Sequence, residues 1–463
     1  MLDDAVQPPE IRRMKIQVSR RHDSGLASLP LALLLASVPV SAGNWPQWRG
    51  PLSNGSAAET GLPETCDPAT AKWSVAMPGA SHATPIVWDD RVFVTSTDPA
   101  SKGLLGMCVN ARDGRILWQK RLGDEIKAPQ NNGATPSPVT DGKRVCFLFG
   151  SGDLATLDLD GNLLWTKNLV KEHGNFCTKF GYSSSPLLWN GTLYIQILRR
   201  SKPYSGAAGT DEPLEALLLA LDFVSGKQLW KKVRKSAAVD EACESYSSAI
   251  PFENKVRNEL LVQGGDCISG HDPATGNEFW RLDYNPQRES NWRLIPSPVT
   301  IGEVIVATKP RGGAMLALKA GGKGELNAEA LAWTYDERTS DSGTPLVYQG
   351  LLYVLQSDKN DPWARGSKSS PGIFLLVIDP ATGKEAGRCQ LAKGGAWRTS
   401  PTGADGKIYV MSEEGEVVVV AAGPNGKILS RADYADGPAC ATIAAANGCL
   451  FIRTATKLTC IAK

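Results

Sequence analysis

Short apolar runs separated by polar glycine turns recur along this chain. Four of them end in a tryptophan: "ARDGRILW" at Trp118, "LDLDGNLLW" at Trp165, "LDFVSGKQLW" at Trp230 and "HDPATGNEFW" at Trp280. Apolar runs of this length bounded by turn residues predict β-strands, and a glycine turn between two of them predicts an antiparallel pair. The tryptophans are 47, 65 and 50 residues apart, and periods in this range are typical of solenoids, propellers or arrays.

A second marker, "TP" or "SP" followed by a β-rich segment, alternates with the first. It occurs at Pro85, Pro138, Pro186, Pro298, Pro345 and Pro401, with a looser copy at Pro251. Proline suits the first residue of a strand, where its missing N–H breaks no ladder bond. Two strand-like runs follow each marker. An eighth copy without proline, residues 441–454, is followed by "KLTCIA" and the end of the chain, so the last unit lacks its outer strand.

The missing strand is predicted at the other end of the repeat region. "AKWSVAMPG", residues 71–79, resembles the end of a repeat, with Trp73 in the place that Trp118 takes in the next unit. Pairing it with the last unit would remove two exposed sheet edges. The sequence therefore predicts an all-β protein: one eight-bladed β-propeller of four-stranded antiparallel blades over residues 71–463, closed by its N-terminal strand and preceded by an extension over residues 43–70.

The turns follow the pattern "AxDxxTGxxxW", with degenerate copies at 379–383 ("DPATG") and 424–426 ("PNG"). This pattern resembles the PQQ-type β-propeller repeat family over roughly residues 45–463. The opening "NWPQWRGP" is also similar to that of secreted PQQ-like repeat proteins. The family includes the quinoprotein dehydrogenases and a non-enzymatic lipoprotein of outer-membrane β-barrel assembly, so the resemblance implies the fold and leaves both functions open. The signatures of WD and kelch repeats do not recur.

Residues 1–42 have the features of a signal peptide rather than of a folded segment. "IRRMKIQVSRRHD" is basic, residues 26–40 are apolar, and "VSA" at 40–42 has small residues where a signal peptidase reads. An apolar run of 15 residues is short for crossing a bilayer. We therefore expect cleavage near Ala42, a periplasmic or secreted location, and a mature chain that is monomeric and has no transmembrane span.

The composition excludes some classes of binding partner but does not identify one. Fifty basic residues face 48 acidic ones, so no broad basic surface for nucleic acid is expected. Ten cysteines in an exported chain permit disulfides. The nearest pairs in the repeat scheme are Cys243 with Cys267 and two of Cys440, Cys449 and Cys460. The alternative is that several of these cysteines are buried free thiols.

Several signatures of redox and metal chemistry are missing from the sequence. It contains no adjacent cysteines, no "CxxCH", no "HExxH" and no clustered His/Cys spacing. Quinoprotein dehydrogenases hold their quinone against a disulfide of adjacent cysteines, so this departure favours a protein without cofactor or metal site and disfavours an enzyme. PQQ with calcium remains the alternative. No catalytic residue is assigned, and a structural role is favoured for His271.

Loop lengths distinguish the two faces of the predicted ring. Loops joining strands 1 to 2 and 3 to 4 of each blade are short, whereas the insertions at 199–215 and 357–372 fall on the opposite face. Function concentrates in such loops. Residues just before the innermost strands are expected to ring the channel at this long-loop face: His82, Asn131, Tyr182, Tyr246, Arg293, Trp397 and Arg398.

Aromatic and arginine side chains at such a ring suit planar or anionic ligands and protein hot spots. The sequence therefore favours an exported binding or scaffold module that engages a protein partner or a small ligand at the long-loop face. The alternative is a PQQ-dependent or divergent quinoprotein-type oxidoreductase.

Overall fold

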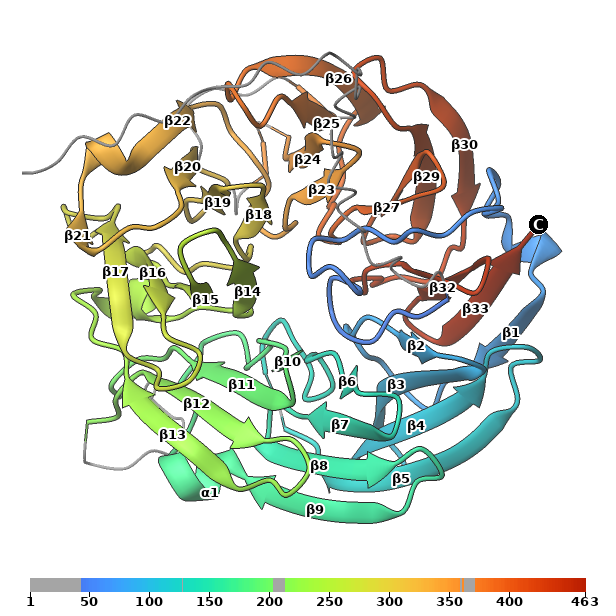
Figure 1. The fold of residues 1–463 in the computed structure, drawn as a ribbon. Helices are drawn as coiled ribbons and strands as arrows, with labels where there is room; N and C mark the ends of the chain where they lie inside the picture. The colour runs from blue at the N-terminus through green and yellow to red at the C-terminus, as the bar shows by residue number, and fades with distance from the viewer. Residues whose placement is uncertain (1–42, 127, 203–212, 359, 362–370) are drawn as a thin grey trace, which may run out of the picture. The chain divides into compact units, whose positions relative to one another are not determined.

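The structure is a computed structural model that describes residues 43–126, 128–202, 213–358, 360–361 and 371–463. They belong to one compact unit, Val40–Lys463. The predicted signal peptide and parts of both long insertions lie outside the described residues. The described residues form eight sheets arranged as blades around a central channel (Figure 1). The predicted eight-bladed propeller is confirmed.

The first four blades follow the chain in order. Blade 1 holds β2 (Ile86–Trp88), β3 (Arg91–Asp98), β4 (Gly103–Asn110) and β5 (Ile116–Asp124). Blade 2 holds β6 (Val139–Thr140), β7 (Arg144–Leu148), β8 (Asp153–Asp158) and β9 (Leu163–Asn168). Blade 3 holds β10 (Leu187–Trp189), β11 (Thr192–Ile197), β12 (Leu217–Asp222) and β13 (Gln228–Val233). Blade 4 holds β14 (Ile250–Glu253), β15 (Asn258–Gln263), β16 (Cys267–His271) and β17 (Glu278–Asp283).

The last four blades complete the ring. Blade 5 holds β18 (Val299–Ile301), β19 (Val304–Thr308), β20 (Met315–Lys319) and β22 (Leu331–Tyr335). Blade 6 holds β23 (Leu346–Tyr348), β24 (Leu351–Gln356), β25 (Ile373–Ile378) and β26 (Glu385–Ala392). Blade 7 holds β27 (Thr402–Ala404), β28 (Lys407–Met411), β29 (Glu416–Ala421) and β30 (Ile428–Asp433). Blade 8 holds β31 (Ala444–Ala446), β32 (Cys449–Arg453), β33 (Lys457–Ala462) and β1 (Trp73–Ala76).

Over the described residues, helical structure is limited to four short segments outside the blades. They are α1 (Leu169–His173) and the 3₁₀ turns η1 (Pro68–Thr70), η2 (Asp240–Cys243) and η3 (Ala328–Ala330). The connection between β20 and β22 contains one further strand. Its residues Gly324–Leu326 form β21, which pairs in parallel with β17 as a fifth strand on blade 4. No helix of the described chain is long and apolar enough to cross a membrane.

Ring closure follows the predicted route. β1 pairs antiparallel with β33, with Trp73 opposite Cys460 and Ala76 opposite Lys457. The first strand of the repeat region is therefore the outer strand of the last blade. The indole N–H of Trp73 then donates to the carbonyl of Ala111 in blade 1, at 3.0 Å, so the same residue joins the two ends of the ring.

The repeated tryptophans connect successive blades. The indole N–H groups of Trp118, Trp165 and Trp230 each donate to a carbonyl in the glycine turn of the next blade, at 2.9–3.1 Å. All three are of intermediate burial. Trp280 is buried and differs, since it donates to Glu259 of its own blade.

The turn glycine and this tryptophan depend on each other. Gly226 has φ +67°, and a Cβ there would lie 2.6 Å from Trp165 Cδ2. We expect Gly226→Ala to lower the free energy of unfolding by ~2–5 kcal/mol, because left-handed strain of ~1–2 kcal/mol adds to overpacking of ~1–3 kcal/mol. Gly191→Ala is the matched control, since Gly191 has φ +75° with open space around its Cβ position. Equal losses in denaturant unfolding would show that the indole contact contributes nothing.

A belt of hydrogen bonds joins the blades around the channel. The hydroxyl of the "TP" and "SP" markers accepts a hydrogen bond from the backbone N–H of the equivalent residue in the preceding blade, at 2.8–3.0 Å. These bonds run in order through Thr84, Ser137, Ser185, Ser248, Ser297, Thr344 and Ser400. In six copies the residue before the proline is thus a blade-to-blade contact, and in the looser copy Ser248, three residues before Pro251, takes this place. The strand-start interpretation of the prolines did not predict these contacts.

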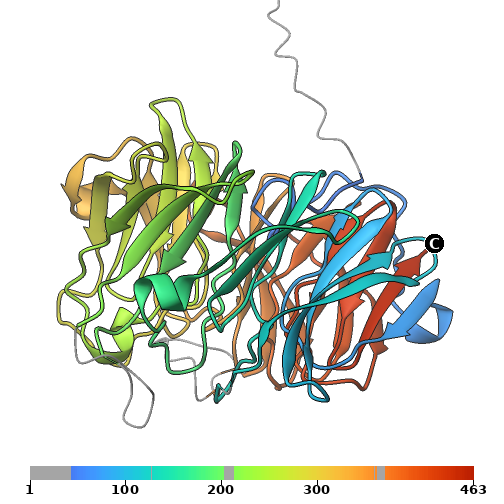
Figure 2. The ribbon, with the colours of Figure 1, turned by 90° about the horizontal axis from the view of Figure 1, so that it is seen from below.

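Residues 44–64, here called the plug, cross the short-turn end of the channel. Trp45 exchanges backbone hydrogen bonds with Val87, Thr140 donates its N–H to the carbonyl of Pro46, and Leu188 donates its N–H to the side chain of Gln47. The plug therefore contacts the first strands of blades 1, 2 and 3. Figure 1 shows this dark-blue segment reaching toward the centre of the ring, and Figure 2 shows it along the upper rim.

The far side of the plug is fixed by a buried arginine. Arg49 donates to the carbonyls of Pro345 and Pro401, at 2.6 and 3.1 Å, and to that of Asn54 at 2.9 Å. Burial lowers the pKa of its guanidinium to about 9. Further along, Gly403 of blade 7 exchanges backbone hydrogen bonds with the plug. The predicted N-terminal extension is thus an integral part of the ring, and it spans the channel at the face opposite the long loops.

Candidate functional site

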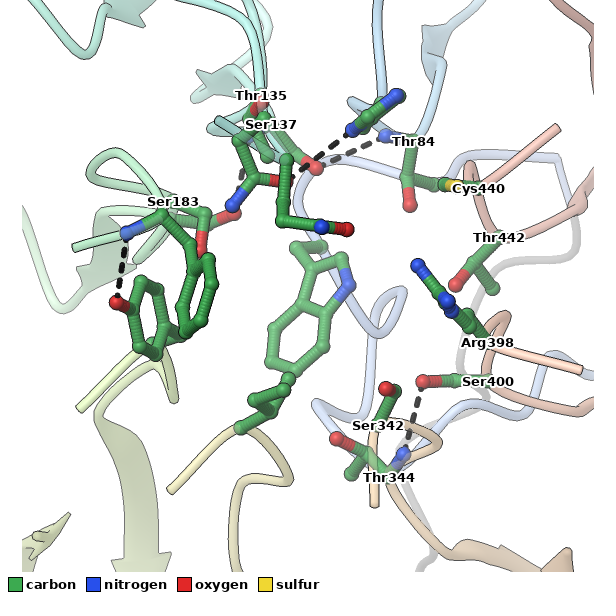
Figure 3. Close-up of a pocket in the computed structure, with 18 of the residues that line it drawn as sticks. Thr84, Thr135, Ser137, Ser183, Ser342, Thr344, Arg398, Ser400, Cys440 and Thr442 are labelled. Carbon is green, nitrogen blue, oxygen red and sulfur yellow. Dashed lines mark hydrogen bonds between the residues drawn. The ribbon is translucent and has the colours of Figure 1, made fainter. Parts of the chain in front are cut away.

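A cavity of about 240 Å³ lies in the channel (Figure 3). Each of the eight segments that lead into a first strand contributes to its lining, and Trp48 of the plug lines it as well. Ligand pockets usually measure ~300–1,000 Å³, so this one suits a small ligand or one group of a larger molecule. Because the plug crosses the short-turn end, the cavity opens toward the long-loop face.

Hydroxyl groups of the belt line this cavity (Figure 3). A hydroxyl carries one donor and two acceptor positions. In Ser137, Thr344 and Ser400 an acceptor position is filled by the neighbouring blade's N–H. Their O–H groups are therefore available as donors to a bound molecule, which gives the cavity a set of donors drawn from several blades.

Asp341 is the acceptor of greatest interest in this lining. It is 3 % exposed. Its Oδ2 accepts a hydrogen bond from Arg293 Nη2 at 2.7 Å, while Oδ1 has no hydrogen-bond partner among the described residues. Burial raises the pKa of the carboxyl group to about 6, against the opposing effect of Arg293 and Arg311. The site thus holds a buried carboxyl group whose pKa is raised to about 6 and whose Oδ1 no described residue engages.

Arg293 is held from several directions. Its guanidinium lies over the ring of Phe180, 5.3 Å from the centroid, and its Nε is 3.8 Å from Glu241 Oε1. Glu241 also pairs with Arg311 at 3.0 Å and Lys179 at 3.5 Å. Breaking such a buried pair costs ~3–5 kcal/mol. Arg293→Ala is therefore expected to destabilise the fold, because the change would leave Asp341 and Glu241 buried with fewer partners.

Arg398 offers a second positive charge at the cavity and is more accessible. Its side chain is 34 % exposed, and its Nε pairs with Glu413 Oε2 at 3.1 Å. An exposed ion pair of this kind contributes little to stability. Arg398 can therefore be substituted with less effect on the fold than Arg293.

The structure brings most of the sequence-predicted residues together. His82, Asn131, Tyr246, Arg293 and Arg398 line the cavity. Two residues do not belong to this lining. The first is Tyr182, which is buried, donates its hydroxyl to the carbonyl of Gln196 at 2.8 Å and stacks on Phe176. The second is Trp397, which is buried and lines a neighbouring cavity that shares Asp341 and Arg398.

The other predicted groups have structural surroundings. His271 is 2 % exposed, with its ring nitrogens 3.2 Å from the carbonyl of Gly276 and 2.9 Å from Ser269 Oγ. Burial lowers its pKa to about 4. All ten cysteines are free thiols, which corrects the possibility of disulfides. Cys440 lines the cavity, and burial raises its pKa to about 12.

Trp48, Asp341 and the hydroxyl belt were missed by the sequence reasoning. The belt had a signal, since Thr or Ser precedes the proline in six copies of the marker. Asp341 lies three residues before Thr344, in the same kind of segment as the predicted residues. Trp48 had no such signal, because nothing in the repeat pattern places the plug inside the channel.

Comparison with known proteins identifies the repeat. The family described as "Outer membrane protein assembly factor BamB" matches residues 66–238. The chain carries PQQ-type propeller repeats. This confirms the resemblance inferred from the turns.

Two curated relatives of this PQQ-repeat chain are polyvinylalcohol dehydrogenases. That of Sphingopyxis sp. (strain 113P3) is 25 % identical over 206 residues, 42 % of this chain and 30 % of the relative. That of Pseudomonas sp. is 26 % identical over 168 residues, 35 % of this chain and 24 % of the relative. The matches thus span less than a third of the length of these relatives.

Solved structures share the fold over most of the PQQ-repeat chain. A europium-containing methanol dehydrogenase has a TM-score of 0.66 at 11 % identity, covering 90 % of this chain and 91 % of its own. The quinohemoprotein alcohol dehydrogenase from Comamonas testosteroni has 0.61 at 14 %, covering 90 % and 80 %. BamB from Moraxella catarrhalis has 0.57 at 14 %, covering 85 % and 97 %. At these identities the likeness establishes the fold.

These comparisons contradict the expectation of a protein without a cofactor. The two curated relatives are dehydrogenases, and the solved structures of this fold include a quinohemoprotein and a europium-containing enzyme. The expectation relied on the missing adjacent cysteines. That pair is one way to cover a quinone, and its absence does not remove the charges and rings that hold one.

The charges and rings that line the cavity suit the carboxylate-bearing edge of a planar quinone. Arg293 and Arg398 supply positive charge, and Trp48, Phe180 and Tyr246 supply aromatic surface. The belt adds hydroxyl donors. Arginine pairs with carboxylates through two parallel hydrogen bonds and stacks on flat rings. Over the residues that the structure describes, no three His, Cys, Asp or Glu side chains are grouped as metal ligands.

Proposed function

We propose that this protein is an oxidoreductase of the quinoprotein type that oxidises a hydroxyl group in the channel cavity. The observation that carries the proposal is Asp341, a buried carboxyl group with a pKa of about 6 and an Oδ1 that no described residue engages. A general base works best when its pKa lies near the working pH. Perturbed carboxyl groups in a cavity are characteristic of functional sites.

Asp341 would accept the proton of the substrate hydroxyl at Oδ1. Arg293 holds Oδ2 at 2.7 Å and so fixes the direction of the open oxygen. Arg293 and Arg398 would bind the carboxylates of the quinone, with Trp48 from the plug against the ring system. A quinone bound there supplies a two-electron acceptor for the carbon that carries the hydroxyl. The plug excludes entry from the short-turn face, so substrate reaches Asp341 from the long-loop face.

The relatives support this reading through the reaction that their names state. Both are dehydrogenases of a polymeric alcohol, and the chain matches part of each. A hydroxyl-bearing substrate is therefore the class to test first. Export after cleavage near Ala42 and a monomeric state are part of the proposal and remain predictions.

A second candidate function is a protein-binding scaffold at the same long-loop face. It is favoured by the family that matches residues 66–238, whose description names an outer-membrane assembly factor, and by the fold of BamB. The two candidates differ in what they need from the cavity. A scaffold needs the outer loops, whereas an oxidoreductase needs the buried carboxylate and the arginines.

Reconstitution tests the proposal. The chain from Gly43 to Lys463, incubated with PQQ and calcium and then desalted, is expected to retain a quinone chromophore and to reduce a dye when given an alcohol. Arg398→Ala should weaken PQQ retention by roughly 10- to 100-fold, because a hydrogen bond to a charged group contributes ~1.5–3 kcal/mol. Lys227→Ala with Lys384→Ala, both in short turns on the other face, is the matched control.

Three outcomes decide between the candidates. Retention and dye reduction that Arg398→Ala weakens support the oxidoreductase. A colourless protein that captures a periplasmic protein through the long loops supports the scaffold. If only the lysine control loses PQQ retention, PQQ binds at the short-turn face and the proposed site is wrong.

A further inference from the structure

His82 and Asn131 form a pair in the cavity lining that the proposed reaction does not use. His82 Nδ1 lies 3.3 Å from Asn131 Oδ1. An amide oxygen can only accept a hydrogen bond, so the imidazole must carry its proton on Nδ1. A neutral imidazole with Nδ1–H has an unprotonated Nε2. This nitrogen has no hydrogen-bond partner among the described residues.

The surroundings keep this histidine neutral. Burial lowers the pKa of His82 below its usual 6.5, and the nearby charges of Arg453 and Arg398 lower it further, while the bond to Asn131 opposes them. Arg398 is paired with Glu413, and the Cys440 thiol lines the same cavity. At neutral pH, His82 Nε2 is therefore an acceptor and not a donor.

The cavity thus has two open acceptors in a lining rich in donors. One is Asp341 Oδ1, on the segment that enters blade 6. The other is His82 Nε2, on the segment that enters blade 1. Asp341 Oδ1 is buried, and a buried acceptor without a donor costs ~1–3 kcal/mol, whereas His82 is half-buried. A bound molecule that satisfies both acceptors must carry at least two donors in separate positions.

We propose that His82 is a specificity-determining residue, whose Nε2 accepts a hydrogen bond from a second hydroxyl of the substrate. This inference rests on the proposed function for the first hydroxyl, the one that Asp341 deprotonates. The substrate class that follows is a diol or polyol rather than a simple alcohol. Asn131 is the positioning residue, since its amide oxygen selects the tautomer that leaves Nε2 open.

The tautomer can be measured without any enzymatic turnover. The chain has four histidines, of which His22 lies in the predicted signal peptide, so ¹⁵N NMR of the chain from Gly43 resolves few imidazoles. His82 is expected as the Nδ1–H tautomer at pH 7, with a pKa below 6.5. Asn131→Leu should return it to the Nε2–H tautomer that free imidazole prefers. A wild-type His82 protonated on Nε2, or a tautomer that Asn131→Leu leaves unchanged, would overturn the proposal.

Substrate preference tests the second hydroxyl. The PQQ-loaded chain is expected to oxidise 1,2- or 1,3-propanediol at least about tenfold more efficiently than 1-propanol, the equivalent of ~1.4 kcal/mol. His82→Leu should bring the ratio of diol to 1-propanol efficiency close to one, and His82→Gln, which retains an acceptor, should restore part of the ratio. A preference that survives His82→Leu refutes the role of Nε2.

Failure of this inference can be told apart from failure of the proposed function. If no alcohol is oxidised, propanediol is titrated into the chain and the His82 ¹⁵N shift is followed. A shift seen with the diols and absent with 1-propanol supports the binding role of His82 even without turnover. No diol-specific shift and no diol preference in turnover would overturn it.

Discussion

A chain that starts at Met77, and so lacks β1 (Trp73–Ala76), will aggregate or melt at a much lower temperature than a chain that starts at Ala71. Without β1, the edge of β33 from Lys457 to Cys460 is exposed, and unpaired edges favour association between molecules. Trp73, 8 % exposed, also loses its place against blade 1. Removal of a buried tryptophan alone costs ~3–5 kcal/mol.

The comparison of the two truncated chains isolates β1, because both lack the plug. The chain from Gly43 to Lys463 serves as the reference in thermal unfolding and size-exclusion chromatography. If the chain from Met77 stays monomeric with the melting temperature of the chain from Ala71, closure by β1 does not stabilise the ring.

Asp341→Asn is expected to stop turnover while making the protein more stable. Loss of a general base lowers the rate by ~10²- to 10⁴-fold. The folded protein favours the protonated carboxyl group, since its pKa is about 6 against an ordinary value of 3.8. Ionised Asp341 therefore destabilises the fold at pH 7, by ~3 kcal/mol at about 1.36 kcal/mol per pKa unit. The neutral amide of asparagine removes this cost, and its oxygen can still accept the hydrogen bond from Arg293, whose guanidinium also keeps Glu241 beside it.

The pH dependence follows with a definite sign. A carboxyl group with a raised pKa costs nothing below pH 3.8, where both states bind the proton, and its cost grows as pH rises to about 6. The gain in stability from Asp341→Asn should therefore appear between about pH 4 and 6 and stay constant above. The turnover of the wild type should rise through pH about 6.

Ser342→Ala, a change in the same cavity lining, is the matched control and should alter neither profile. Normal turnover by Asp341→Asn would exclude this carboxylate as the base. A melting temperature lower than that of the wild type at pH 7 would contradict the sign of its pKa shift.

The repeat pattern was sufficient to predict the ring. A turn glycine and a tryptophan recur because each junction needs the same contact, as Gly226 and Trp165 show. The same logic placed His82, Asn131, Tyr246, Arg293 and Arg398 at the channel, since equivalent positions in a closed repeat meet at the axis. Tyr182 and Trp397 sit in equivalent segments, but packing against their own blade neighbours draws their side chains away from the cavity.

Features that occur only once in the chain could not be predicted from the repeat pattern. The plug belongs to no repeat, so its path across the channel depends on contacts such as those of Arg49 with Pro345 and Pro401, which lie hundreds of residues away in sequence. The pKa of Asp341 depends likewise on three-dimensional burial and on Arg293 and Arg311. The expectation of no cofactor relied on the missing pair of adjacent cysteines. The absence of one motif does not exclude other residues that can hold a quinone.

Because the plug crosses the short-turn end of the channel, molecules reach the cavity from the long-loop face. An open propeller channel would let one molecule enter as another leaves through the opposite end. In the proposed reaction, substrate, product and the external electron acceptor would all pass through the long-loop opening. In the proposed reaction the oxidised product would have to depart before the external acceptor could approach, so the two half-reactions would alternate and never overlap.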